Sequence, residues 1–226
     1  HDSAGKAILL LPFFSREQFS IIDNWHVSGL RGSGSHDVEV RDGFVPTDRW
    51  LTLSDPLSVA GTLFKFPIIS TFPPAVAAVS IGIARAAFDC FMELAPNKVP
   101  VAGTIPISEF GSVQSVVAKA EALIDSARSY IYEVVDSLWT DIENGKAATI
   151  DARRRIRLAG SHAASLAADS VDLLYNAAGS SSIAETCPLQ RYFRDIHVTT
   201  QHHHVQGGEL ERMGRLRLTG SVEGLV

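Results

Sequence analysis

Three long stretches of the sequence repeat apolar residues every three or four positions, and this repeat constrains the fold more than any other feature. The stretches cover residues 73–96, 108–145 and 149–179. This spacing places apolar side chains along one face of a helix. Such a helix is stable in water only when another element covers its apolar face. We therefore expect an antiparallel helical bundle, completed by a shorter helix over residues 187–200.

Residues that favour helix ends bound these stretches. Pro73 and Pro74 suit the first turn of a helix, where no backbone N–H is needed. Ser108 predicts the N-cap of the second helix, and Thr149 or Asp151 that of the third. Glycine after the third stretch, at residue 179, suits a helix end because glycine adopts a left-handed conformation without strain.

The first 50 residues have a β pattern instead. KAILLLPF is a short apolar run suited to a strand, and IIDNWHVSGL is a second candidate. HDVEVRDGFVP alternates, with Val38 and Val40 on one side, and predicts a half-buried strand. We therefore expect a β unit over residues 1–50 and a helical domain over residues 51–226. The abrupt start at His1 suggests the C-terminal part of a longer protein.

Charge, hydropathy and cysteine usage narrow the possible partners and compartments. A net charge of −5 gives no basic surface for nucleic acid. The longest apolar stretch is interrupted by Pro73 and Pro74, which argues against a membrane span. Cys90 and Cys187 fit neither a zinc spacing nor a disulfide framework. A cytoplasmic protein with reduced thiols is expected.

The loop GLRGSGS, residues 29–35, combines glycines with polar side chains. Its glycines free the backbone, Arg31 carries a positive charge, and Ser33 and Ser35 offer hydroxyls. Such a loop can bind an anionic group. It is neither a P-loop nor a dinucleotide fingerprint, because no lysine stands in the right place and a strand follows instead of a helix. A flexible connection between strands is the alternative.

Three consecutive histidines, His202, His203 and His204, raise three possibilities. Adjacent side chains point in different directions, so the three cannot all face one ion without distortion. A metal site would also need acidic or thiolate partners at a suitable spacing, and we expect no metal. A solvated run without function is the second possibility. The third is one histidine acting in proton transfer near neutral pH.

Charged residues on the predicted helices suggest surface ion pairs. Arg191 and Asp195 are four residues apart and can pair on a helix. The run ARRRIR, residues 152–157, is expected to form a solvated helix face.

The stretches DNWHVSGLRGSGSHDVEVRDGFVP, PISEFGSVQ and YFRDIHVTTQH resemble the acyl-CoA dehydrogenase superfamily. Within it, they are most similar to the reduced-flavin-dependent monooxygenases of two-component systems. The resemblance implies a helical domain, a β-barrel-like domain and a C-terminal antiparallel four-helix bundle. This chain would contain the last strands of the β domain and the bundle, a mainly α fold, and would form a homo-oligomer, either a dimer or a tetramer.

The resemblance also implies an activity. A separate flavin reductase would supply reduced FMN or FAD, which reacts with O2 to form a C4a-(hydro)peroxyflavin. This species would hydroxylate a small aromatic, heterocyclic or other heteroatom-containing substrate. The alternative is an FAD-dependent acyl-CoA dehydrogenase-like oxidoreductase, with Glu209 or Glu211 as the base.

Site residues follow from the same resemblance. The catalytic glutamate of the dehydrogenases would fall at His203, and the monooxygenase histidine at His202, which we expect to be the catalytic residue. Arg31, Ser33 and Ser35 are expected to contact the cofactor. So are Gly179, Ser180 and Ser181, which follow the third helix. In that helix Tyr175 and Ala178 replace the glutamine and a glycine of the dehydrogenase FAD motif, which favours FMN or a loosely exchanging flavin.

Overall fold

The structure is a computed structural model, and it describes residues 9–52 and 59–221. Contacts between residues divide the chain into two compact units. The first contains His1–Val27 and Arg31–Ala60, and the second contains Ser28–Leu30 and Gly61–Val226. Each unit is described separately.

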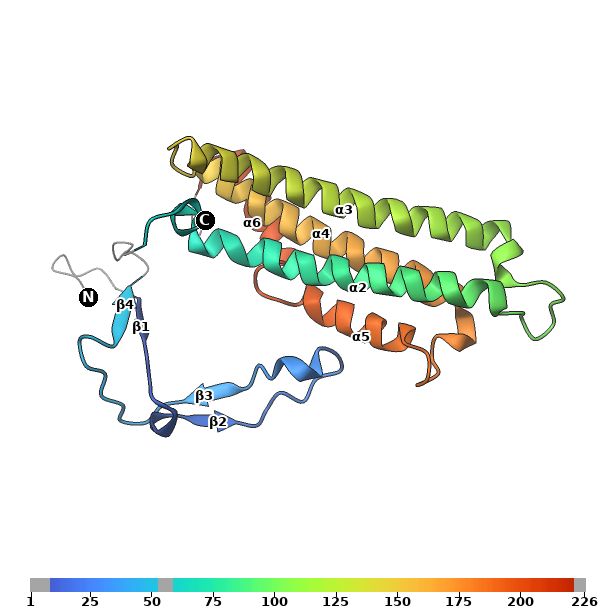
Figure 1. The fold of residues 1–226 in the computed structure, drawn as a ribbon, viewed down its shortest axis with the longest axis horizontal. Coiled ribbons are helices and arrows are strands. Elements are labelled where there is room, and N and C mark those ends of the chain that lie inside the picture. Colours follow the sequence, from blue (N-terminus) through green and yellow to red (C-terminus); the bar gives the residue numbers. More distant parts are fainter. Residues whose placement is uncertain (1–8, 53–58, 222–226) are drawn as a thin grey trace. The chain divides into compact units, whose positions relative to one another are not determined.

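The first unit contains two antiparallel strand pairs (Figure 1). In one, Leu11 of β1 lies opposite Leu51 of β4, and in the other Ile21 of β2 lies opposite Val38 of β3. Val38 is 59% exposed, so the prediction of a half-buried strand was wrong for this residue. Two-stranded pairs bury little side-chain surface by themselves, and the strand residues of β1, β2 and β4 here are also largely exposed. The elements are β1 (Leu10–Pro12), η1 (Arg16–Gln18), β2 (Ser20–Ile22), η2 (Arg31–Ser33), β3 (Asp37–Glu39) and β4 (Trp50–Thr52).

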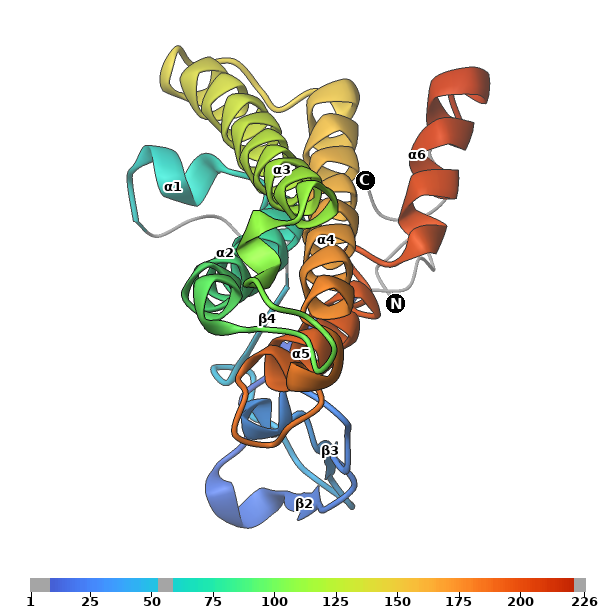
Figure 2. The same cartoon turned by 90° about the vertical axis from the view of Figure 1, so that its right-hand side faces the viewer.

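The second unit is helical, as the apolar repeat predicts. Three long helices, α2, α3 and α4, lie side by side in both views, with α5 against α2 and α4, and α6 against α4 (Figures 1 and 2). The helices are α1 (Thr62–Lys65), α2 (Phe72–Leu94), α3 (Gly111–Glu143), α4 (Ile150–Ala177), α5 (Leu189–Thr200) and α6 (Gly207–Thr219). Short 3₁₀ turns connect them: η3 (Ile68–Thr71), η4 (Ala95–Asn97), η5 (Ile107–Glu109) and η6 (Gly179–Ser181).

Most predicted helix ends are confirmed. Prolines occupy the first turn of α2, and the Thr149 side chain accepts the Ala152 N–H at 3.1 Å as the N-cap of α4. Ser108 is not the N-cap of α3, contrary to the prediction. It lies in η5, and Phe110 is the N-cap because its backbone is extended and its carbonyl oxygen accepts the first helical hydrogen bond, from the Gln114 N–H at 3.0 Å.

The core of the helical unit forms where four helices meet. Phe91, Ile124, Leu174 and Ile196, from α2, α3, α4 and α5, are fully or almost fully buried in one cluster. Closer to the start of α2, Gly160 of α4 brings the two backbones together. A Cβ at this position would lie only 2.6 Å from the Cβ of Pro73.

The α2 region is strongly apolar. Within the described residues, Ile68–Asn97 is long and apolar enough to cross a membrane, with a mean hydropathy of 1.6 in its most apolar window. The prolines do not interrupt it, because they occupy the first turn of α2. Core helices of soluble proteins have the same composition, and α2 packs against α3, α4 and α5, so this pattern is weak evidence for a span.

Candidate functional site

The histidine run lies in a tight turn between α5 and α6, which we call the histidine turn (residues 201–206). The helical pattern of α5 continues into it, since the His202 N–H donates to the Thr199 carbonyl oxygen at 3.1 Å. The His202 carbonyl oxygen in turn accepts the Gln206 N–H at 3.0 Å. These backbone hydrogen bonds fix the positions from which the three imidazole rings extend.

The three histidines have different environments. His202 and His203 are exposed, whereas His204 is partly buried and stacks on the ring of Phe72, with centroids 4.8 Å apart and planes at 5°. Burial lowers the pKa of His204, and the nearby His202, His203 and Arg157 act in the same direction. Among residues 9–52 and 59–221, no three His, Cys, Asp or Glu side chains group as a metal site would require.

A backbone donor orients His202. The His204 N–H donates to Nδ1 of His202 at 3.3 Å. An amide can only donate, so Nδ1 must offer its lone pair, and a neutral His202 then carries its proton on Nε2. The exposed edge of His202 is therefore a hydrogen-bond donor.

A buried ion pair lies below the histidine turn. Arg157 of α4 and Glu209 of α6 are 2% and 1% exposed, and Nη1 of the arginine donates to Oε2 of the glutamate at 2.7 Å. The prediction of a solvated face was therefore wrong at Arg157, because α6 covers this part of α4. It holds for Arg155, which pairs with Glu133 at 2.9 Å and stays 36% exposed.

The glycine loop is anchored on α5 through residues 28–30. The Leu30 N–H donates to Oδ1 of Asp195 at 2.7 Å. Gly29 is buried, and a Cβ there would lie 2.4 Å from the carbonyl oxygen of Arg194. Asp195 therefore binds this loop, and the predicted pairing with Arg191 was wrong. A local spacing rule could not reveal an acceptor used by a distant backbone N–H.

The turn after α4 combines exposed polar groups with a lysine. Gly179 has φ +53° and is exposed with Ser180, while Ser181 is partly buried. The Lys98 ammonium donates to the carbonyl oxygen of Ala178, and a Cβ at Gly179 would lie 3.4 Å from its nitrogen. The sequence analysis missed Lys98, because nothing local connects it to a turn 80 residues away.

Arg31, Ser33 and Ser35 form a separate group in the first unit. All three are exposed, and the hydroxyl oxygens of the two serines lie 3.4 Å apart. Gly34 between them has φ +57°, which glycine adopts without strain. The predicted cofactor-binding residues thus form two local groups: Arg31, Ser33 and Ser35 in the first unit, and Gly179, Ser180 and Ser181 in the second.

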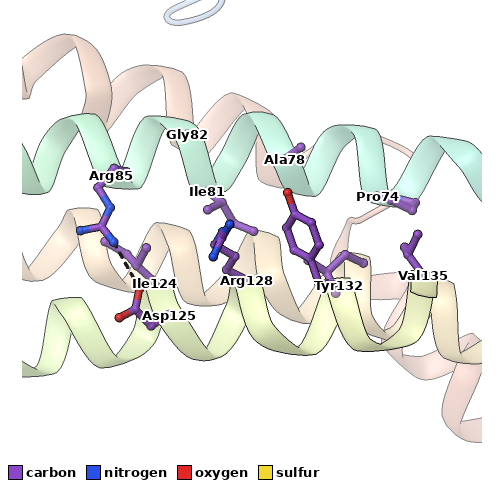
Figure 3. Close-up of a pocket in the computed structure, with 11 residues that line it drawn as sticks. Pro74, Ala78, Ile81, Gly82, Arg85, Ile124, Asp125, Arg128, Tyr132 and Val135 are labelled. Atoms are coloured by element: carbon purple, nitrogen blue, oxygen red, sulfur yellow. Dashed lines mark hydrogen bonds and ion pairs between the residues drawn. The ribbon is translucent and has the colours of Figure 1, made fainter. Parts of the chain in front are cut away.

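A groove of about 610 Å³ lies between α2 and α3 (Figure 3). Its volume is within the range of small-molecule sites, about 300–1,000 Å³. Arg85 reaches across it to Asp125 at 3.2 Å, and the Arg128 guanidinium lies 4.9 Å from the centre of the Tyr132 ring. The sequence analysis did not identify this groove, since its walls come from two helices. Its apolar lining includes Pro74, Ala78, Ile81, Ile124, Ile131 and Val135.

Comparison with known proteins identifies relatives along most of the chain. The family model "Acyl-CoA dehydrogenase, C-terminal domain" matches residues 75–207. The indole-3-acetate monooxygenase of Acinetobacter baumannii is 32% identical over 84% of this chain and 49% of its own length. The flavin-dependent monooxygenase oxygenase subunit HsaA of Rhodococcus jostii is 31% identical over 88% of this chain and 54% of its own length. The chain thus spans about half the length of these curated relatives.

A solved structure shows the same fold. XiaF from Streptomyces sp., in complex with FADH2 and glycerol, matches with a TM-score of 0.87 and 26% identity, over 96% of this chain and 57% of that protein. The family match covers most of α2, all of α3, α4 and α5, and the histidine turn. This is more than half of the chain, and it therefore belongs to the acyl-CoA dehydrogenase C-terminal domain family.

Proposed function

We propose that the protein containing this chain is the oxygenase component of a two-component flavin-dependent monooxygenase. It would take reduced flavin from a separate reductase and use O2 to hydroxylate a small aromatic or heteroatom-containing substrate. The names of the relatives from Acinetobacter baumannii and Rhodococcus jostii support this activity. The observation that carries it is the orientation of His202, whose Nδ1 accepts the His204 N–H in a turn that contains no glutamate.

His202 is the proposed catalytic residue. A bound reduced flavin supplies the reaction with O2, which no side chain of this chain can perform. The Nε2–H of His202 would donate a hydrogen bond toward the reacting oxygen and exchange a proton with it, since an imidazole titrates near neutral pH. The anchored Nδ1 keeps the proton on the outer nitrogen.

The polar turn after α4 fits a flavin phosphate or ribityl chain. Gly179 leaves room for a close approach, the hydroxyls of Ser180 and Ser181 can donate, and Lys98 adds a positive charge. Arg31, Ser33 and Ser35 provide a second set of donors in the first unit. Both sets suit the anionic side of FMN or FAD.

The Tyr175 ring favours FMN or a loosely held FAD. It stacks on Phe193, with centroids 4.3 Å apart, so this position offers an aromatic surface and no side-chain amide. An adenosine group would therefore lose the amide partner that a glutamine provides.

The arrangement of the acidic residues disfavours an acyl-CoA dehydrogenase. That reaction needs a free carboxylate to remove a carbon-bound proton. Glu209 cannot serve, because it is 1% exposed and bound to Arg157. Glu211 is the remaining candidate, on an exposed position of α6.

The domain organisation is part of the proposal. Residues 51–226 would form a four-helix bundle from α2, α3, α4 and α5, which share one buried cluster. Residues 1–50 would be the last strands of a β-barrel-like domain. We propose a cytoplasmic homo-oligomer, either a dimer or a tetramer, and light scattering on the purified protein would measure its mass.

The decisive experiment uses the full-length protein under anaerobic conditions. Oxidised and reduced FMN and FAD are titrated separately, and each complex is then mixed with O2 and a panel of aromatic substrates, with and without a flavin reductase and its NAD(P)H. We expect tighter binding of reduced flavin, one turnover from pre-bound reduced flavin, and repeated hydroxylation only with the reductase and NAD(P)H. His202→Ala should abolish hydroxylation, with His203→Ala as the matched control. Reduction of bound FAD by an acyl-CoA, or full hydroxylation by His202→Ala, would overturn the proposal.

A further inference from the structure

Four buried polar atoms on α4, on α6 and in the histidine turn have no hydrogen-bond partner among the described residues. They are Nε of Arg157, Oγ of Ser161, Nδ1 of His204 and Oε1 of Glu209. Arg157 and Ser161 are one turn apart on α4, so their side chains share a face. Native proteins leave few such groups unpaired, and an internal water commonly accounts for them.

The chemistry of these atoms is complementary. Arg157 Nε–H and the Ser161 hydroxyl can donate, the Glu209 oxygen can only accept, and the His204 nitrogen can do either. Arg212 lies 3.0 Å from the same Glu209 oxygen, without hydrogen-bond geometry. A buried water makes about three hydrogen bonds, which this set can supply.

The charged and titratable neighbours of His204 come from three elements. Arg157 lies on α4, Glu209 on α6, and His202 and His203 in the histidine turn itself. Phe72 of α2 covers one face of the ring by stacking. One face of the ring thus lies against an aromatic surface and the buried ion pair is near enough to act on its charge, while the backbone N–H of His204 donates to His202.

We propose that Arg157 and Glu209 are positioning residues for His202, acting through an internal water and the ring of His204. The water joins His204 Nδ1 to the buried pair and fixes the ring against Phe72. The His204 N–H is then held toward Nδ1 of His202, which stays in the Nε2–H form. A role of this arrangement in hydroxylation rests on the proposed function. The arrangement of the water, His204 and the buried pair does not depend on that function.

The test is long-range ¹H–¹⁵N correlation NMR of the [¹⁵N]histidine-labelled chain at a pH where His202 is neutral. A His202→Gln spectrum assigns the His202 signals. We expect the parent chain to show the Nε2–H pattern for this ring. In the double variant Arg157→Met/Glu209→Leu, the two nitrogen shifts should move toward the average of both tautomers, and the His204 amide should exchange several-fold faster.

A matched control and a second variant keep the test decisive. Arg155→Met/Glu133→Leu makes the same two changes in an exposed pair that joins α4 to α3, and it should leave His202 unchanged. If the first double variant does not fold, His204→Phe decides. It retains an aromatic ring for Phe72 and the backbone N–H, but removes Nδ1, and it should shift His202 in the same direction.

Two results would overturn the proposal. One is a folded Arg157→Met/Glu209→Leu or His204→Phe variant with the parent His202 pattern, even if its thermal stability falls. The other is an equal change in the control pair. Because these spectra are recorded without flavin, they are independent of the hydroxylation assay, and either proposal can fail without the other.

Discussion

The backbone N–H of Leu30 donates to Oδ1 of Asp195 at 2.7 Å, although the two residues are 165 positions apart. A carboxylate acceptor makes this bond stronger than a neutral one. Asp195 lies on α5, and His202 follows it by seven residues, two positions beyond the end of that helix. The residue that precedes Arg31 is thus attached to the helix that leads into the histidine turn.

Asp195→Ala should release residues 28–30 from α5. Hydrogen exchange in this segment should become faster, and the free energy of unfolding should fall by about 1 kcal/mol, because the partly buried amide loses its acceptor. Asp195→Asn keeps an acceptor oxygen and should lose less. Asp169→Ala, on the exposed side of α4, is the control for removal of a carboxylate. Unchanged exchange in Asp195→Ala would contradict this prediction.

Gly29→Ala should also destabilise the contact between residues 28–30 and α5. The added methyl would lie 2.4 Å from the Arg194 carbonyl oxygen, and overpacking of this kind costs about 1–3 kcal/mol. Gly32→Ala adds the same group three residues later, where nothing lies within 4 Å, and should change stability by less than about 0.5 kcal/mol. Urea unfolding of both variants measures the difference, and equal midpoints would count against the close approach.

Arg157→Met should be among the most destabilising single changes in the helical unit. It removes the buried partner of the Glu209 carboxylate and leaves only Arg212, 3.0 Å from its other oxygen; breaking a buried pair costs up to about 3–5 kcal/mol. Arg155→Met breaks an exposed pair between α4 and α3 and should cost about 0.2–1 kcal/mol. Chemical denaturation at neutral pH compares them. A cost for Arg157→Met as small as that of its neighbour would show that solvent reaches Glu209.

The depressed pKa of His204 predicts a loss of stability in acid. Burial lowers the folded-state pKa below the ordinary 6.5, so the unfolded chain binds this proton more readily. The resulting contribution is fully present above about pH 6.5 and decreases as the pH falls toward the folded value. His204→Gln should therefore flatten the decrease in unfolding free energy between about pH 7 and pH 5. His162→Gln, on an exposed position of α4, should keep the parent slope.

The sequence predicted elements whose signal is local. The three long helices follow from the 3.6-residue repeat, and Thr149 caps α4 as expected because capping acts within one turn. The partners of Asp195 and Arg157 could not be predicted, since each depends on a segment distant in the chain. Charge alone made Arg157 look solvated. The sequence analysis did not anticipate α6, in which only Glu209, Met213 and Leu216 are buried.

The candidate site was predicted less completely than the fold. His202 came from a family resemblance, because nothing in three consecutive histidines distinguishes one from another. Their different surroundings arise from the fold: His204 is covered by Phe72 and its neighbours, while His202 stays exposed. Lys98 and the turn at Gly179 are 80 residues apart along the chain, so only the folded structure brings them together.

The close contact between Gly160 and Pro73 helps to fix the position of Phe72, the ring on which His204 stacks. Phe72 immediately precedes Pro73. The contact between the α2 and α4 backbones therefore sets the position of the Phe72 ring, which stacks on the His204 imidazole. Side chains adapt to substitutions by changing rotamer, but two backbones in contact have no such freedom. Substitutions of the side chains around the histidine turn can therefore be accommodated locally, whereas any residue larger than glycine at position 160 would displace α2 and, with it, Phe72.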